Sequence, residues 1–139
     1  MAFFISKEEV IAAHYFMMNR MNDADQAGVK DHGLLEFALH RPEQSLFGQD
    51  AYPSIFDKAA AFLESLVKNH CFHNGNKRTA YLVTKSFLKL NGFQLQMERA
   101  DAVEFIVDIA QGKYSLESIA RVLKELSKEV PKDYFISKT

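Results

Sequence analysis

Ten consecutive residues, His70 to Thr79, combine side chains that could handle a phosphate group. The segment reads HCFHNGNKRT and holds histidines, two asparagines, a glycine and two adjacent cations. A guanidinium group binds phosphate oxygens through paired hydrogen bonds, and an ammonium group adds a point charge. An imidazole can take a proton from an attacking hydroxyl. The segment therefore predicts a nucleotide-phosphate site with a general base beside it.

The position of Lys77 and Arg78 sharpens this prediction, because they stand where a helix is expected to begin. Cations at a helix N-terminus oppose the macrodipole, so an anion among them would relieve the mismatch. We expect free backbone N–H groups at Gly75, Asn76 and Lys77 to point into the same space, where Gly75 lets the backbone approach a ligand. The predicted phosphate-binding residues are Gly75, Asn76, Lys77 and Arg78.

His70 is the candidate catalytic base. It follows Val67 by three residues and Leu66 by four, so it extends the apolar stripe of the preceding helix. The sequence therefore predicts a partly enclosed imidazole next to the phosphate site.

The remaining residues of the segment receive supporting roles. Asn74 or Asn76 offers an amide oxygen to Mg²⁺, which usually accompanies nucleotide phosphates. Phe72 is an aromatic residue among polar loop residues, so we expect it to anchor the loop to the core.

Other interpretations of these residues are weaker. His70 and His73 with Cys71 suggest zinc, but there is no second ligand cluster and the spacing fits no closed site. The segment also lacks the Gly-Lys pair and the upstream glycine of a P-loop. Lys85 and Lys89 lie on one helical stripe with the motif cations, and we interpret them as a solvated face.

Composition limits the class of protein. A chain of 139 residues with 47% apolar and 25% charged residues fits a single globular domain, 1–139. Its 17 basic residues are balanced by 18 acidic ones, so direct DNA binding is not expected. One free cysteine and the lack of a signal peptide or apolar span favour the cytoplasm and no membrane association.

Hydrophobic periodicity predicts an all-α, compact helical bundle with at most a short β segment. The first helix covers 7–20 and starts with a Ser6–Glu9 capping box, and the helix before the motif starts at Ser54 and ends near His70. Further helices are expected from 34 to Pro42, from the motif to Asn91, over 100–111 and over 116–128. A short strand is expected at 93–97, loops at 22–33 and before Pro53, and 131–139 is left uncertain.

The motif residues carry a family resemblance. HCFHNGNKRT resembles the Doc (death-on-curing) toxin branch of the Fic/Doc family, with the pattern His-x-Phe-x-Asn/Asp-Ala/Gly-Asn-Lys-Arg. The matching residues are His70, Phe72, Asn74, Gly75, Asn76, Lys77 and Arg78. The resemblance extends through GLLEFALHRP at 33–42 and Leu46-Phe47-Gly48, so it covers most of the chain and implies the Fic/Doc bundle.

This resemblance implies a function. Fic proteins transfer AMP from ATP, but they have a glycine in place of Lys77 and a second arginine in place of Tyr81. Both differences favour the Doc branch, whose members resemble kinases. A Doc-like toxin would use ATP and Mg²⁺ to phosphorylate a Ser or Thr hydroxyl of a translation factor, such as translation elongation factor Tu, and so stop growth.

The resemblance also implies a partner. Doc-like toxins are neutralised by a small, Phd-like antitoxin. Some Fic proteins carry their own inhibitory helix, but no Ser or Thr precedes a Glu by four residues in this chain, so inhibition is expected from a separate chain. Two alternatives stay open: AMP transfer to a protein hydroxyl, and a non-catalytic domain that binds a nucleotide or partner.

Overall fold

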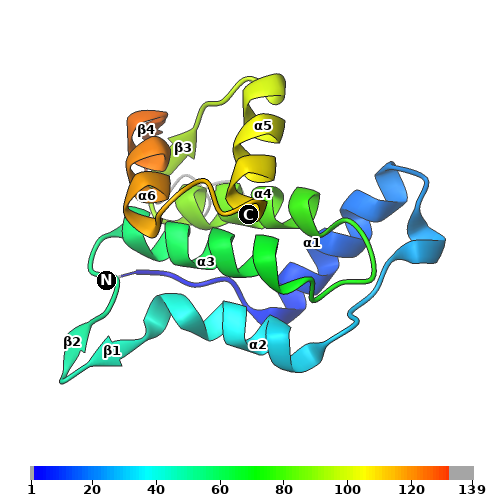
Figure 1. Cartoon of the computed structure of the whole chain (residues 1–139), viewed down its shortest axis with the longest axis horizontal. Coiled ribbons are helices and arrows are strands. Elements are labelled where there is room, and N and C mark those ends of the chain that lie inside the picture. The colour runs from blue at the N-terminus through cyan, green and yellow to red at the C-terminus, as the bar shows by residue number, and fades with distance from the viewer. Residues whose placement is uncertain (1, 132–139) are drawn as a thin grey trace.

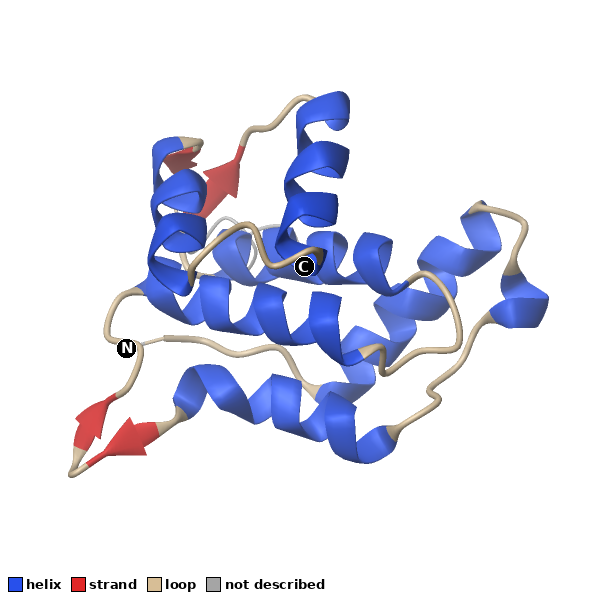
Figure 2. Cartoon of the chain, in the orientation of Figure 1, coloured by secondary structure: helices blue, strands red, loops and turns tan. Residues whose placement is uncertain are grey.

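The computed structural model describes residues 2–131, and within them helices dominate (Figures 1 and 2). The helices are α1 (Lys7–Arg20), α2 (His32–His40), α3 (Ile55–Asn69), α4 (Asn76–Leu90), α5 (Arg99–Ala110) and α6 (Leu116–Glu125). Two antiparallel pairs join β1 (Ser45–Leu46) to β2 (Gln49–Asp50) and β3 (Phe93–Leu95) to β4 (Ser127–Glu129). The predicted all-α bundle is confirmed.

Helix α3 lies at the centre and contacts α2, α4, α5 and α6. The Ser54 hydroxyl accepts the Asp57 N–H and the Asp57 carboxylate accepts the Ser54 N–H, which fixes where the helix begins. The predicted apolar stripe is buried at Ala59, Phe62, Leu63, Leu66 and Val67. Helix α4 runs beside α3 in Figure 1 and buries Ala80, Val83 and Phe87. The core therefore holds both helices that flank the motif.

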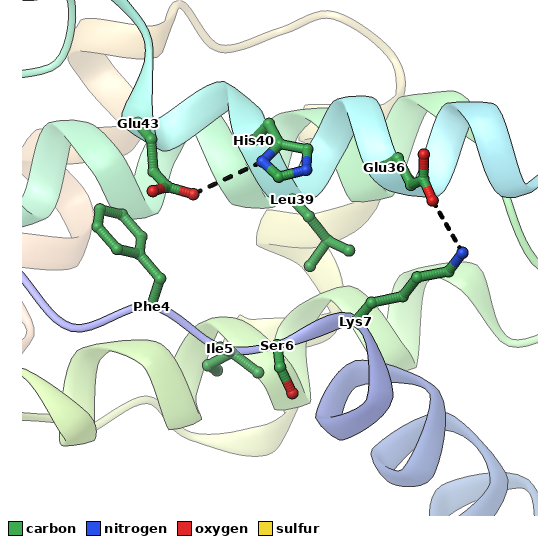
Figure 3. A pocket seen from close by; sticks show the side chains of 8 residues that line it. All are labelled: Phe4, Ile5, Ser6, Lys7, Glu36, Leu39, His40 and Glu43. Carbon is green, nitrogen blue, oxygen red and sulfur yellow. Dashed lines mark hydrogen bonds and ion pairs between the residues drawn. The ribbon is translucent and has the colours of Figure 1, made fainter.

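The first residue of α1 is joined to α2 by an ion pair. Lys7 Nζ donates to Glu36 Oε1 at 3.0 Å, and His40 lies 3.7 Å from Glu43 (Figure 3). A cavity of about 280 Å³ lies between residues 4–7 and α2. None of the residues that line it belongs to the motif. The predicted Ser6–Glu9 capping box is present and sets the start of α1.

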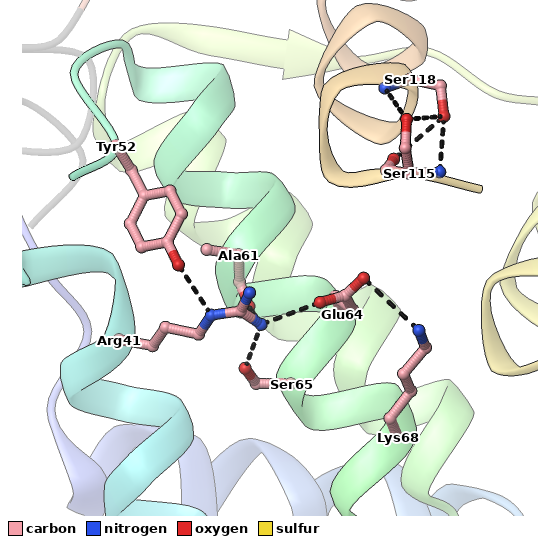
Figure 4. A network of polar contacts seen from close by, with 8 residues as sticks. All are labelled: Arg41, Tyr52, Ala61, Glu64, Ser65, Lys68, Ser115 and Ser118. Atoms are coloured by element: carbon pink, nitrogen blue, oxygen red, sulfur yellow. Dashed lines mark hydrogen bonds and ion pairs between the residues drawn. The ribbon is translucent and has the colours of Figure 1, made fainter. Parts of the chain in front are cut away.

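A polar network attaches the chain after α2 to the middle of α3 (Figure 4). Arg41 lies in a 3₁₀ turn, Arg41–Glu43, and its Nη1 donates to Glu64 Oε1 and Ser65 Oγ, both at 2.9 Å. Its Nε donates to the Tyr52 hydroxyl at 3.0 Å. One guanidinium group thus links both ends of the segment that carries the β1–β2 hairpin.

Three local predictions were wrong. The segment before Pro53 contains the β1–β2 hairpin, and the loop at 22–33 contains a 3₁₀ turn, Ala24–Gln26. The helix predicted to reach Lys128 ends at Glu125, because 127–129 pair with β3. Such pairing depends on residues distant in sequence, which helical periodicity does not report.

Helix α2 begins two residues earlier than expected, at His32, because the Asp31 side chain accepts the Leu34 N–H at 3.0 Å. Of the uncertain C-terminal segment 131–139, residues 132–139 lie outside the described part. In the part of the chain that is described, no helix is long and apolar enough to cross a membrane.

Candidate functional site

The motif forms the loop between α3 and the first turn of α4. The loop is bounded by two residues in the left-handed conformation, His70 at φ 50° and Gly75 at φ 71°. A left-handed conformation is unfavourable for histidine, because its Cβ crowds the following carbonyl. Strained backbone of this kind persists where the surrounding structure enforces it, and it clusters at functional sites.

The predicted enclosure of His70 is wrong, since its side chain is exposed. His70 is the C-cap of α3, and its left-handed backbone departs from the helix there. The i+3 and i+4 relation to Val67 and Leu66 therefore does not determine where the imidazole points. Exposure at the edge of the loop leaves the ring accessible to a substrate hydroxyl.

Backbone hydrogen bonds hold the loop against the segment 28–31. The Cys71 carbonyl accepts the Lys30 N–H at 2.7 Å and the Asp31 N–H at 3.1 Å. The His73 N–H donates to the Gly28 carbonyl at 3.0 Å. These bonds form a short bridge beside the motif, so the loop conformation is fixed by a segment about forty residues earlier.

Asn76 fixes the loop through its side chain. Its Oδ1 accepts the Phe72 N–H at 2.9 Å and its Nδ2 donates to the Phe72 carbonyl at 3.0 Å. The amide oxygen that was expected to be available to Mg²⁺ is therefore engaged within the loop. The contribution that Asn76 can make to an anion is its backbone N–H, in the first turn of α4.

Asn74 is engaged in a similar way. Its Oδ1 accepts the Gly75 N–H at 2.7 Å, and its Nδ2 donates to Gln26 Oε1. The expectation of a free N–H at Gly75 is therefore wrong. The described residues hold no group of three or more His, Cys, Asp or Glu side chains that could bind a metal. The described residues thus do not fit a Mg²⁺ ion held by the protein alone, and the metal role of Asn74 stays a prediction.

Gly75 is required by packing as well as by its backbone angle. A Cβ on this residue would lie 2.5 Å from Met18 Sδ and 3.0 Å from Met17 Cε. Two methionine side chains of α1 thus lie so close to Gly75 that a Cβ there would force them to shift. Gly75 was expected to leave room for a ligand, and the space beside it is occupied by the Met17 and Met18 side chains of α1.

Lys77 and Arg78 lie exposed in the first turn of α4, which contains no acidic residue. Neither forms an ion pair with any residue that the structure describes. The first bond at the start of the helix runs from the Thr79 N–H to the Gly75 carbonyl at 2.9 Å, so the N–H groups of Asn76, Lys77 and Arg78 precede the helical ladder. Two uncompensated cations beside three N–H groups are the arrangement that an anion-binding cradle requires, and we refer to these residues, 76–78, as the cradle.

Sequence analysis missed His14, which is fully buried beneath the loop. Its Nε2 accepts the Gly28 N–H at 3.0 Å, and its Nδ1 lies 2.9 Å from Thr79 Oγ1. Its ring stacks on Phe72, with centroids 4.0 Å apart and an interplanar angle of 14°. Burial, and then the charge of nearby His73, lowers the pKa of His14 to about 4. The available signal was its spacing of four residues from both Val10 and Met18, which are also buried.

Phe72 itself is 1% exposed, as expected of an anchor, and it pairs through its backbone with Val29. The ring of His14 lies on one face of it. The loop therefore presents its polar residues outward from a fixed aromatic base.

A groove of about 560 Å³ extends from the cradle between α1, α4 and α5. Four cations line it: Lys77, Arg78, Lys85 and Arg99. The apolar part of its lining comes from Met17, Met21, Met97, Ala102, Val103, Ile106 and Val107. Aspartate and glutamate are absent from its lining. The groove is thus apolar with a rim of one charge sign.

Comparison with known proteins identifies the class to which this fold and motif belong. The model of the Fic/DOC family matches residues 4–88, more than half of the chain. The chain belongs to the Fic/DOC family, and within it to the Doc branch.

Two relatives are similar over most of their length. "Toxin Doc" of Mycolicibacterium smegmatis is 43% identical over 99 residues, which are 68% of this chain and 75% of the relative. "Protein kinase doc" of Escherichia phage P1 is 30% identical over 122 residues, which are 88% of this chain and 94% of the relative.

Proposed function

We propose that this protein is the toxin of a toxin–antitoxin pair and acts as an ATP-dependent kinase on a protein hydroxyl. The observation that carries the proposal is the pair of exposed, unpaired cations, Lys77 and Arg78, in the first turn of α4. They follow His70 by a short loop with a fixed conformation. The names of the two relatives, a toxin and a protein kinase, agree with this proposal.

The proposed reaction uses these groups as follows. His70 accepts the proton of a Ser or Thr hydroxyl, and the hydroxyl oxygen attacks the terminal phosphorus of ATP. The bond from that phosphorus to the bridging oxygen breaks, and ADP leaves with the electron pair. Lys77, Arg78 and the first-turn N–H groups bind the phosphate oxygens and stabilise their charge. Mg²⁺ bound with the nucleotide would neutralise further phosphate charge, and a translation factor such as elongation factor Tu is the proposed substrate.

Labelled ATP tests the reaction. The protein is incubated with cell extract and ATP labelled at either the α- or the γ-phosphate. Transfer of the γ label to protein is the expected result. Transfer of the α label alone would replace the kinase proposal with AMP transfer, in which pyrophosphate leaves. Growth inhibition that persists in a His70→Ala variant would favour the non-catalytic alternative.

We propose that the groove is the docking site of the antitoxin. Its apolar lining and basic rim fit an amphipathic helix with acidic residues, because opposite charges favour encounter and fix register. Such a segment would cover Lys77 and Arg78, so binding there would block the anion cradle. Docking in the groove is thus the proposed route by which a separate, Phd-like chain would inhibit the toxin.

A charge reversal tests the docking site. Arg99 lines the groove outside the motif, and Arg121 is an exposed cation on α6 that does not line it. In co-expression with a Phd-like antitoxin that neutralises the unaltered protein, Arg99→Glu should weaken neutralisation, whereas Arg121→Glu should not. Equal neutralisation of both variants would contradict docking in the groove.

A further inference from the structure

His14 connects three separate segments at the base of the motif. Its imidazole contacts the Gly28 N–H from the loop before α2, the Thr79 hydroxyl from α4, and the Phe72 ring from the motif loop. Each ring nitrogen has one polar partner and one ring face has the aromatic partner. No other residue described above bonds to both the segment at 28 and the first turn of α4.

The hydrogen bonds define the form of the ring. Because Nε2 accepts a hydrogen bond from the Gly28 N–H, it carries no proton itself; the ring proton lies on Nδ1, which donates a hydrogen bond to Thr79 Oγ1. Gly28 in turn accepts the His73 N–H through its carbonyl. A continuous chain of contacts therefore runs from Thr79 in α4 through His14 to Phe72 and His73 in the motif loop.

We propose that His14 is a positioning residue for the phosphate site: as a neutral imidazole it holds the loop 70–75 in register with the first turn of α4. This inference rests on the proposed function, because the loop carries the proposed base, His70, and the first turn of α4 carries the proposed phosphate-binding cations, Lys77 and Arg78. Displacement of the reacting groups by a fraction of an ångström to one ångström is enough to slow an enzyme strongly. His14 itself is buried and touches no substrate.

Helix α4 offers a matched pair of residues for testing this role. Thr79 and Thr84 are both buried, at 0% and 1% exposure. The Thr79 hydroxyl bonds to His14, whereas the Thr84 hydroxyl is buried without a hydrogen-bond partner. Replacement of either by valine removes one hydroxyl at nearly constant volume, so the two variants differ mainly in the bond to His14.

The experiment measures ATP-dependent label transfer and amide hydrogen exchange on the full chain. Thr79→Val should lower kcat by about tenfold, the equivalent of one hydrogen bond, with KM for ATP and the number of ATP sites per chain unchanged. It should also speed exchange at the His73 amide. Thr84→Val should change neither quantity more than about twofold, and Thr79→Ser should restore both.

A double-variant cycle assigns the effect to His14. His14→Phe keeps an aromatic ring on Phe72 and removes both hydrogen bonds, so Thr79→Val added to it should cause no further loss. Full additivity, or equal effects of Thr79→Val and Thr84→Val, would overturn the positioning role. If the wild-type chain transfers no label, the proposed function fails, and the His73 exchange rates still decide whether His14 holds the loop.

Discussion

The α3–α4 loop and the β1–β2 turn both depend on left-handed residues, but their surroundings differ. His70 and Gly75 bound a loop that is held by Asn76, His14 and the segment 28–31. Phe47 and Gly48 form a two-residue turn at φ 52° and 77°, and Phe47 is 96% exposed. One unfavourable conformation is enforced from several sides, whereas the other rests on a hairpin of two residue pairs. Persistent strain in the first region is therefore the stronger indication of function.

Asparagine at the two left-handed residues, His70 and Phe47, should show whether the His70 side chain is needed for catalysis or only its backbone conformation. Asparagine tolerates this backbone, so His70→Asn should fold normally and lose label transfer by a factor on the order of 100 or more. Phe47→Asn should keep the activity. Transfer assays with γ-labelled ATP measure both, and a His70→Asn variant within threefold of wild type would remove His70 from the reaction.

Alanine at the two glycines tests how tightly each turn is enclosed. Gly75→Ala should destabilise the fold by about 3 kcal/mol, because it adds a contact with Met18 Sδ to the backbone penalty. Gly48→Ala meets no atom within 4 Å and should lose about 1 kcal/mol. Urea denaturation gives both values. Equal losses would show that the approach of α1 does not restrict the motif.

The acid sensitivity of stability should come partly from the base of the motif. The pKa of His14 is about 4 in the fold and about 6.5 in an unfolded chain, so the unfolded state binds the proton first as pH falls. The stabilisation is complete above about pH 6.5 and is lost toward pH 4, on the order of 3 kcal/mol. The free energy of unfolding is measured against pH for the unaltered protein and for His14→Phe. Carboxylates titrate in both proteins, so the difference between the two curves isolates the contribution of His14. Parallel curves for the two proteins would contradict a neutral, buried His14.

The smallest effect is expected at the hairpin. A turn of this kind favours asparagine before glycine, because both central residues need positive φ. Phe47→Asn should therefore raise the free energy of unfolding by about 0.5 kcal/mol, as measured by thermal unfolding. A loss of stability would show that the exposed Phe47 ring is held by contacts within the chain.

The two regions also show what the sequence could predict. The faces of α3 and α4 follow from apolar periodicity, and the starts of α1 and α3 follow from their capping boxes, since both signals are local. The hairpin and β4 depend on pairing between strands that periodicity does not report. His14 was missed because it lies at helical spacing within α1 and its partners, Gly28, Phe72 and Thr79, come from other segments.

The candidate site divides in the same way. The residue types at 70–78 predict an anion cradle, which stays a prediction; what the structure does show is that Lys77 and Arg78 lie at the start of α4, as expected, and are exposed. The sequence did not indicate that the Asn74 and Asn76 side chains bind within the loop, because an amide serves a backbone and a ligand equally well. Their hydrogen bonds assign them to the loop in this structure.

The central claim is that the first turn of α4 binds nucleotide phosphate, and an NMR titration with ATP tests it most directly. The backbone amides of Asn76, Lys77 and Arg78 should shift on addition of ATP, whereas those of the β1–β2 hairpin at 45–50 should not. Saturable shifts at 76–78 that disappear in an Arg78→Gln variant are the predicted result. Saturable shifts elsewhere, with 76–78 unchanged, would contradict the account.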